Sequence, residues 1–166
     1  MKRTDFFDEY SGETLEELLA YPSKGQYAPL ARAFEKAIQQ KVVQKGKDCL
    51  SEEEGIVLAV RALDREVNNG GYDQFFCNSS RQYASTVVDA LRQIGCDKAA
   101  AITQRALDAL NVSSLDPDLI AKAITKNDDR RSEELNKCDR LFYQAHQEIS
   151  KNLYLFVKRN KTRIKF

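Results

Sequence analysis

The chain has 166 residues, of which 42% are hydrophobic and 31% are charged, and only 7 Gly and 3 Pro interrupt it. A chain of this length buries about two-thirds of its unfolded surface in one domain, so it needs no disulfide or metal to fold. The chain has 26 Lys and Arg residues and 25 Asp and Glu residues, so its formal net charge is +1. This balance excludes a strong electrostatic field of the whole molecule that would attract DNA, a membrane surface or an acidic partner.

The spacing of cysteine and the lengths of apolar runs set further limits. The four cysteines are widely spaced, with one histidine to accompany them: Cys49, Cys77, Cys96, Cys138 and His146. A structural zinc site needs four N or S ligands in close local pairs, so we predict reduced thiols, no metal and no cofactor. No apolar run approaches the roughly 18 residues of a membrane span, and the N-terminus turns acidic at Asp5 before a signal-peptide core develops. We therefore expect a cytoplasmic protein with no membrane partner.

Caps and apolar spacing predict the first two helices. Thr14 and Glu17 have the spacing of a capping box, which predicts a short helix that ends before Tyr21. Its apolar face consists of Leu15, Leu18 and Leu19. Residues 27–43 repeat apolar side chains at helical spacing, and Gly46 ends this run.

The middle of the chain predicts three more helices. Ser51 and Glu54 repeat the capping-box spacing ahead of a strongly periodic helix. The inner face of that helix consists of Ile56, Val60, Leu63 and Val67. Residues 81–95 form another periodic segment, and Asp97 is placed to cap a helix over 97–111.

A short helix and a long one complete the prediction. Asp116 as N-cap and Pro117 as first helical residue open the short helix. The long C-terminal helix follows Leu135, Cys138, Phe142, Ala145, Ile149, Asn152 and Phe156. Leu153–Val157 could also form a strand, but the helical period enters it unbroken. The fold class is all-α: a single compact multi-helix domain over 1–157, with a basic tail over 158–166.

The segment from Glu66 to Asn78 is the most distinctive part of the chain, and we call it the corner. Paired Asn and Gly end the preceding helix, because these residues tolerate a left-handed backbone. If a helical turn follows, three aromatic rings share one face and two amides share another, where the amides could hydrogen-bond the backbone that the corner frees. The candidate site residues are Glu66, Asn69, Gly70, Gly71, Tyr72, Asp73, Gln74, Phe75, Phe76 and Asn78. They serve either a purely structural role or recognition of a partner.

Two catalytic alternatives remain. A small hydrolase could use Glu66 and Asp73 as an acid–base pair if Glu66 turns toward Asp73 across the corner. Cys77 with His146 would be the only thiol–imidazole pair for nucleophilic catalysis, although both residues fit a packing role better. No Ser-His-Asp motif, glycine-rich cofactor loop or metal-binding triad is present in the sequence.

The corner also carries a family resemblance. The string from Asn69 to Ser79, followed by Ala90-Leu91-Arg92-Gln93-Ile94-Gly95, resembles the signature of the bacterial DNA-mimic-protein-like family, in the pattern N-G-G-[FY]-x-Q-[FY]-F-x-N-S. The resemblance implies a cytoplasmic all-α domain, and it implies a homodimer whose acidic surface imitates DNA and occupies a transcription factor. Such mimicry needs rows of carboxylates spaced like phosphates, which a chain of charge +1 does not hold in general excess.

We therefore predict a non-catalytic protein-binding module that regulates or inhibits another bacterial protein without imitating DNA. The tail residues Lys158, Arg159, Lys161, Arg163 and Lys165 are expected to form a solvated, frayed end. Nucleic acid is not expected as a partner, because no aromatic platform or base-reading motif accompanies these cations.

Overall fold

The computed structural model describes residues 7–21 and 25–166 of the chain. The α-helices are α1 (Leu15–Leu19), α2 (Tyr27–Lys45), α3 (Glu52–Cys77), α4 (Val87–Gln93), α5 (Asp97–Ala109), α6 (Pro117–Ile124), α7 (Asp129–Ala145) and α8 (Ile149–Arg159). Short 3-10 helices lie at η1 (Lys47–Cys49), η2 (Ser79–Tyr83) and η3 (His146–Glu148). The all-α prediction is confirmed, since the described residues include no strand. The first six residues of the predicted domain lie outside the described part.

Both predicted capping boxes are formed. Thr14 caps α1, with its backbone N–H donating to Glu17 Oε2 at 2.9 Å and its hydroxyl accepting from the Glu17 backbone. Ser51 and Glu54 make the same reciprocal pair at the start of α3, at 2.9 and 3.2 Å. These boxes satisfy N–H groups that the first helical turn leaves without partners, so local sequence sets where both helices begin.

Two predicted helix starts differ from the structure. The helix expected over 81–95 begins as η2, and α4 starts only at Val87. Asp97 is the first residue of α5 instead of its cap, and no side chain caps that helix. Asp116 does cap α6 as predicted, because its Oδ1 accepts the backbone N–H groups of Asp118 and Leu119 at 2.9 and 3.2 Å.

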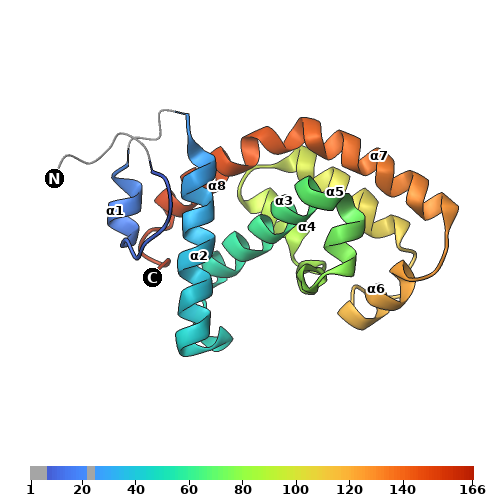
Figure 1. The fold of residues 1–166 in the computed structure, drawn as a ribbon, viewed down its shortest axis with the longest axis horizontal. Coiled ribbons are helices and arrows are strands. Elements are labelled where there is room, and N and C mark those ends of the chain that lie inside the picture. Colours follow the sequence, from blue (N-terminus) through green and yellow to red (C-terminus); the bar gives the residue numbers. More distant parts are fainter. Residues whose placement is uncertain (1–6, 22–24) are drawn as a thin grey trace.

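Helix α3 runs through the centre of the molecule and packs against α2, α4, α7 and α8 (Figure 1). Helix α7 lies along one long side, with α5 packed against it, while α6 closes one end of the molecule and α1 and the C-terminus lie at the other. The predicted inner face of α3 is buried, as its apolar residues are at most 7% exposed. This arrangement brings α7 against the break in α3 that is described below.

The predicted long C-terminal helix is present over 129–159, and η3 divides it into α7 and α8. The tail after it is packed rather than frayed, which corrects the expectation from its charge. Ile164 is 1% exposed, and the backbone N–H of Lys165 donates to Glu54 Oε1 at 2.8 Å. Burial of two tail groups, one apolar and one hydrogen-bonded, outweighs the tendency of a basic end to remain in water.

No helix in residues 7–21 and 25–166 combines the length and apolar character needed to cross a membrane.

Candidate functional site

Gly70 and Gly71 break α3 at the corner. Gly70 has φ −153° and ψ 24°, and Gly71 has φ 73° and ψ −175°, so neither is helical. A Cβ at Gly71 would also lie 2.8 Å from Cγ of Asp139, and one at Gly70 would lie 2.9 Å from Cδ of Gln74. Gly71 is therefore required twice, for its left-handed backbone and for the close approach of α7. The predicted role of these glycines in ending a helical segment is confirmed.

After the break, the chain re-enters a helical turn and buries its aromatic rings as predicted. Tyr72, Phe75 and Phe76 are each 0% exposed. The Tyr72 ring meets the edge of Phe142 on α7 at a centroid distance of 5.8 Å. Its hydroxyl bonds Thr103 Oγ1 at 2.8 Å, and burial raises the pKa of Tyr72. The rings thus anchor the corner to α5 and α7.

Helix α7 caps both sides of the break with two side chains one turn apart. Asp139 Oδ1 accepts the backbone N–H of Tyr72 at 2.8 Å, at the start of the second helical segment. The hydroxyl of Tyr143 donates to the backbone carbonyl of Val67 at 3.2 Å, at the end of the first. A carboxylate at a helical N-terminus and a donor at a C-terminal carbonyl each match the backbone dipoles there. Helix α7 therefore satisfies one backbone N–H and one carbonyl at the break, and Asn68 Nδ2 within α3 satisfies the Asp64 carbonyl at 2.7 Å.

The corner amides bind a carboxylate instead, which corrects the prediction that they would bond the freed backbone. Gln74 Nε2 and Asn78 Nδ2 both donate to Glu66 Oε2 at 2.8 Å, and Ser80 Oγ donates to Glu66 Oε1 at 2.9 Å. Burial opposes ionisation of Glu66, but these three hydrogen bonds outweigh it and lower its pKa from the ordinary 4.5. Glu66 is thus an ionised clamp between the two segments of α3 and η2.

A buried ionic network continues from the clamp along α3 to α2. Arg61 Nη1 donates to Asp64 Oδ2 at 2.7 Å, and its Nε lies 3.3 Å from Glu35 Oε2 on α2. Arg65 also pairs with Glu35 and lies 3.7 Å from Glu66 Oε1. Burial raises the pKa of Asp64, although Arg61 counteracts it. Ser80, Asp139 and Tyr143 are the corner partners that the sequence did not reveal, and Glu35 is the partner of Arg61 and Arg65 just before the corner. Glu35, Asp139 and Tyr143 lie on other helices, so no local pattern could have identified them.

The structure does not assemble either catalytic pair. Glu66 uses both carboxylate oxygens in the clamp, while Asp73 is exposed and no hydrogen bond joins the two among the described residues. Cys77 is exposed on the corner, whereas His146 stacks on Phe142 and places Nδ1 3.6 Å from Asp64 Oδ1. Across 7–21 and 25–166, no group of three or more His, Cys, Asp and Glu side chains could hold a metal ion.

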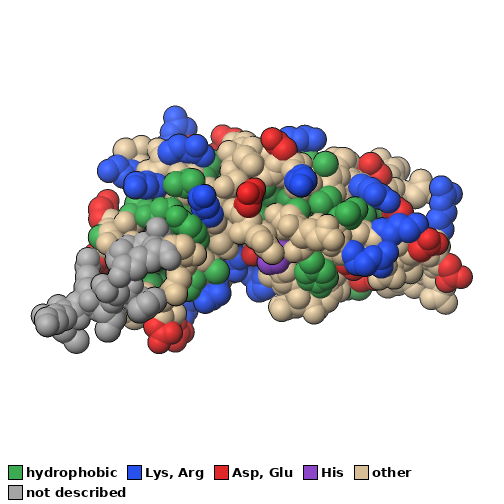
Figure 2. Space-filling view, turned by 90° about the horizontal axis from the view of Figure 1, so that it is seen from above, with side chains coloured by type: hydrophobic (Ala, Val, Ile, Leu, Met, Phe, Trp, Pro, Cys, Tyr) green, Lys and Arg blue, Asp and Glu red, His purple; other side chains and the backbone are tan. Residues whose placement is uncertain are grey.

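The outer rim of the corner presents Asn69, Asp73 and Tyr143, which we call the corner face. All three side chains are exposed, and the Tyr143 ring is 43% exposed although its hydroxyl is fixed to Val67. Asp73 interacts electrostatically with Asp139, one turn before Tyr143 on α7. The side of the molecule that α7 and α8 line carries acidic, basic and apolar side chains interspersed (Figure 2). A partly exposed aromatic ring held in one position is suited to contact with another molecule.

Comparison with known proteins places the chain in a family. No curated protein and no solved structure matches it. The family described as DMP19-like protein matches residues 48–160, which span α3 to α8 and include the whole corner. This match covers more than half of the chain, so the protein belongs to the DMP19-like protein family.

Proposed function

We propose that this protein is a non-catalytic protein-binding module that regulates or inhibits another protein in the bacterial cytoplasm. The corner face is its contact surface. The observation that carries this proposal is the half-exposed ring of Tyr143, held in one position by the hydrogen bond from its hydroxyl to Val67 O. A pre-positioned aromatic ring loses little conformational freedom when a partner covers it, so it contributes strongly to binding.

The polar groups beneath the corner face support binding rather than catalysis. Glu66 is held ionised by three donors, so it is a poor proton donor at neutral pH. Asp139 accepts a backbone N–H, and Tyr72 is fully buried. Each polar group here has a structural partner, which leaves the exposed rim free to meet another protein.

The charge distribution favours a contact other than DNA imitation. Four carboxylates but only two guanidinium groups are buried among the described residues, namely Glu35, Glu54, Asp64, Glu66, Arg61 and Arg131. Internal pairing thus removes more acidic than basic groups from the surface. A DNA-like row of phosphate mimics would need the opposite, an excess of exposed carboxylates. We therefore propose that recognition uses the aromatic and amide groups of the corner face.

Affinity capture from the native lysate tests the proposal. The immobilised wild-type protein should retain one other protein in near-stoichiometric amount. Tyr143→Ala should weaken that capture roughly tenfold or more, because it removes a fixed aromatic anchor. Tyr143→Phe keeps the ring but loses the hydrogen bond that positions it, so its capture should fall between those of the wild type and Tyr143→Ala. Leu155→Ala is the matched control, since Leu155 is 39% exposed on α8, outside the corner face.

Three results would contradict the proposal. Equal loss of capture in the Leu155 and Tyr143 variants would show a general surface effect. Recovery of this same chain as the retained protein would make the face a homodimer contact instead of a regulatory one. Turnover of a substrate by the wild-type protein, lost in Glu66→Gln, would restore the catalytic alternative. Circular dichroism of each variant checks that its helical fold is intact.

A further inference from the structure

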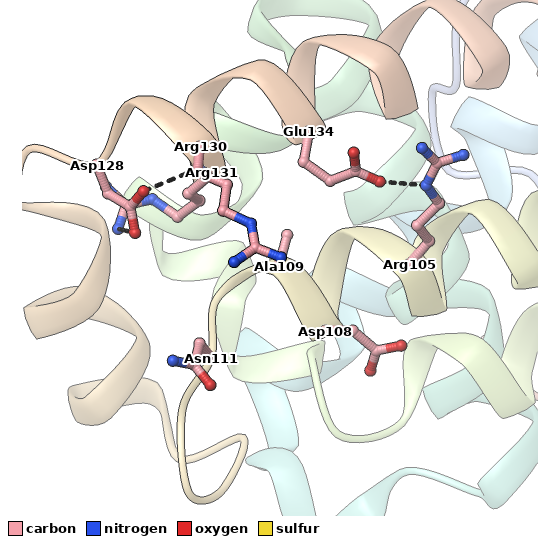
Figure 3. A pocket seen from close by; sticks show the side chains of 8 residues that line it. All are labelled: Arg105, Asp108, Ala109, Asn111, Asp128, Arg130, Arg131 and Glu134. Carbon is pink, nitrogen blue, oxygen red and sulfur yellow. Dashed lines mark hydrogen bonds and ion pairs between the residues drawn. The ribbon is translucent and has the colours of Figure 1, made fainter.

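A second surface, at the opposite end of α7 from its corner contacts, consists of two adjoining hollows. The first, of about 540 Å³, lies between α5 and α7 and has Arg105 and Asp108 on one side and Arg130 and Glu134 on the other (Figure 3). The second, of about 400 Å³, lies against α6. Both are lined by Asn111, Asp128 and Arg131, so the two hollows form one continuous groove.

Internal contacts engage the carboxylates that line this groove. Asp108 accepts from Gln104 Nε2 at 2.9 Å, and Asp128 accepts the backbone N–H of Arg131 at 3.0 Å. Glu134 is paired with Arg105 across the first hollow. None of these three carboxylates is therefore left as a bare negative charge facing the groove. Arg105 balances the charge of Glu134, and Arg131 Nη1 lies 3.9 Å from Asp128 Oδ2, whereas Asp108 is hydrogen-bonded to a neutral amide.

The charged groups left without a contact are all cationic. Arg130 lines the first hollow, and Lys122 and Lys126 line the second. All three side chains are exposed, and no hydrogen bond or ion pair joins their charged groups to any residue in 7–21 or 25–166. The interaction of Arg130 with Glu134 is electrostatic only, without a hydrogen bond or ion pair. Lys and Arg side chains stand among Asp and Glu side chains at this end of the molecule (Figure 2). The groove therefore offers unbalanced positive charge.

Arg131, where the hollows join, supplies an independent sign of an absent ligand. Its side chain is 7% exposed, and its Nη groups donate to backbone carbonyls of Ala123 and Lys126 at the end of α6. Its Nε is buried and has no hydrogen-bond partner among the described residues. A buried guanidinium N–H without an acceptor is costly, so a ligand oxygen or a water held beneath a ligand would relieve it.

We propose that this groove binds an acidic segment of a partner protein, with apolar side chains between its carboxylates. The floor of the second hollow provides apolar surface from Leu110, Val112, Leu119 and Ala123. Carboxylates of the segment would pair with Arg130, Lys122 and Lys126. A nucleic-acid backbone fits less well, because Asp108, Asp128 and Glu134 interrupt the cations and no aromatic ring lines the hollows for base stacking. This surface goes beyond the corner face and does not depend on it.

The test uses nuclear magnetic resonance titration of the full chain with a short synthetic peptide of alternating Glu and Leu. Backbone amide shifts should concentrate at Asn111, Lys126 and Arg130. The double variant Lys122→Glu, Arg130→Glu should bind about tenfold more weakly, since like charges now face the peptide. The double variant Lys158→Glu, Arg159→Glu changes the net charge equally at exposed sites on α8 and should bind like the wild type.

Further binding measurements distinguish between the possible outcomes. A Lys and Leu peptide should not bind, and higher salt should weaken the Glu and Leu peptide because exposed charges are screened. Tyr143→Ala should leave peptide binding unchanged, so failure of the corner proposal does not affect this one. The groove proposal is overturned if the peptide shifts no groove amide, or if both double variants weaken binding equally. It is also overturned if a single-stranded oligonucleotide shifts the groove amides and the peptide does not.

Discussion

Asp139 Oδ1 on α7 accepts the backbone N–H of Tyr72 at 2.8 Å, directly beside the left-handed Gly71. The carboxylate therefore occupies the space that a side chain at position 71 would need. This hydrogen bond positions the second segment of α3 and gives the backbone N–H of Tyr72 its acceptor. It also holds α7 close to α3. This contact explains why a glycine and an aspartate far apart in the sequence depend on each other.

Gly71→Ala should destabilise the protein by about 2 to 4 kcal/mol, because the methyl group meets Asp139 and the backbone has φ 73°. Gly55→Ala is the matched control within the same helix. Its added Cβ would have nothing within 4 Å and its backbone is helical, so it should stabilise by up to about 1 kcal/mol. Urea unfolding measures both free energies. Equal effects of the two substitutions would show that the corner imposes no special requirement.

Asp139→Ala should cost about 1 to 3 kcal/mol, since the Tyr72 N–H loses its acceptor. Asp139→Asn should cost less, because an amide oxygen can replace Oδ1 and the neutral side chain avoids the burial penalty that raises the pKa of Asp139. Hydrogen exchange of the Tyr72 amide provides a local readout. Its protection should fall in the Ala variant and persist in the Asn variant. Unchanged protection in both would mean that Asp139 does not cap the segment.

The pH dependence of stability should identify the Glu66 clamp. The pKa of Glu66 is lower in the folded protein than its ordinary value of 4.5, so the folded state binds fewer protons than the unfolded state. The stability that ionised Glu66 contributes is fully present above the ordinary pKa of 4.5 and is lost as pH falls through the lower pKa of the folded state. The difference in unfolding free energy between wild type and Glu66→Gln should therefore be largest near neutral pH and shrink below about pH 4.5. Asp64 and Asp139, whose pKa values are raised, are common to both proteins and cancel in this difference. A difference that is constant across pH would contradict the clamp.

Local sequence predicted the helices better than it predicted the site. Ser51 and Glu54 are three residues apart and satisfy each other, so the start of α3 is encoded where it forms. The corner glycines and the buried face of Tyr72 were likewise visible as residue types. Asp139 and Tyr143, however, act across 67 and 76 residues of sequence. A single chain does not reveal which distant helix faces a break, because tertiary packing chooses the partner. The prediction that Gln74 and Asn78 bond the freed backbone was wrong for a different reason, because the break in α3 turns both amides toward Glu66, 8 and 12 residues earlier in the chain.

The shared acceptor of the two corner amides leads to a test of cooperativity. Gln74 and Asn78 both donate to Glu66 Oε2, so Gln74→Ala or Asn78→Ala alone leaves that oxygen with one donor and should cost about 1 kcal/mol. The double variant removes both donors from a carboxylate that remains largely buried, so its cost should exceed the sum of the single costs. Urea unfolding of the four proteins gives the coupling free energy, and capture of the partner is measured alongside. Because neither amide belongs to the corner face, partner capture should follow stability only. Additive costs would show that Glu66 does not join the two amides. Loss of capture at wild-type stability would instead place Gln74 and Asn78 in the contact surface.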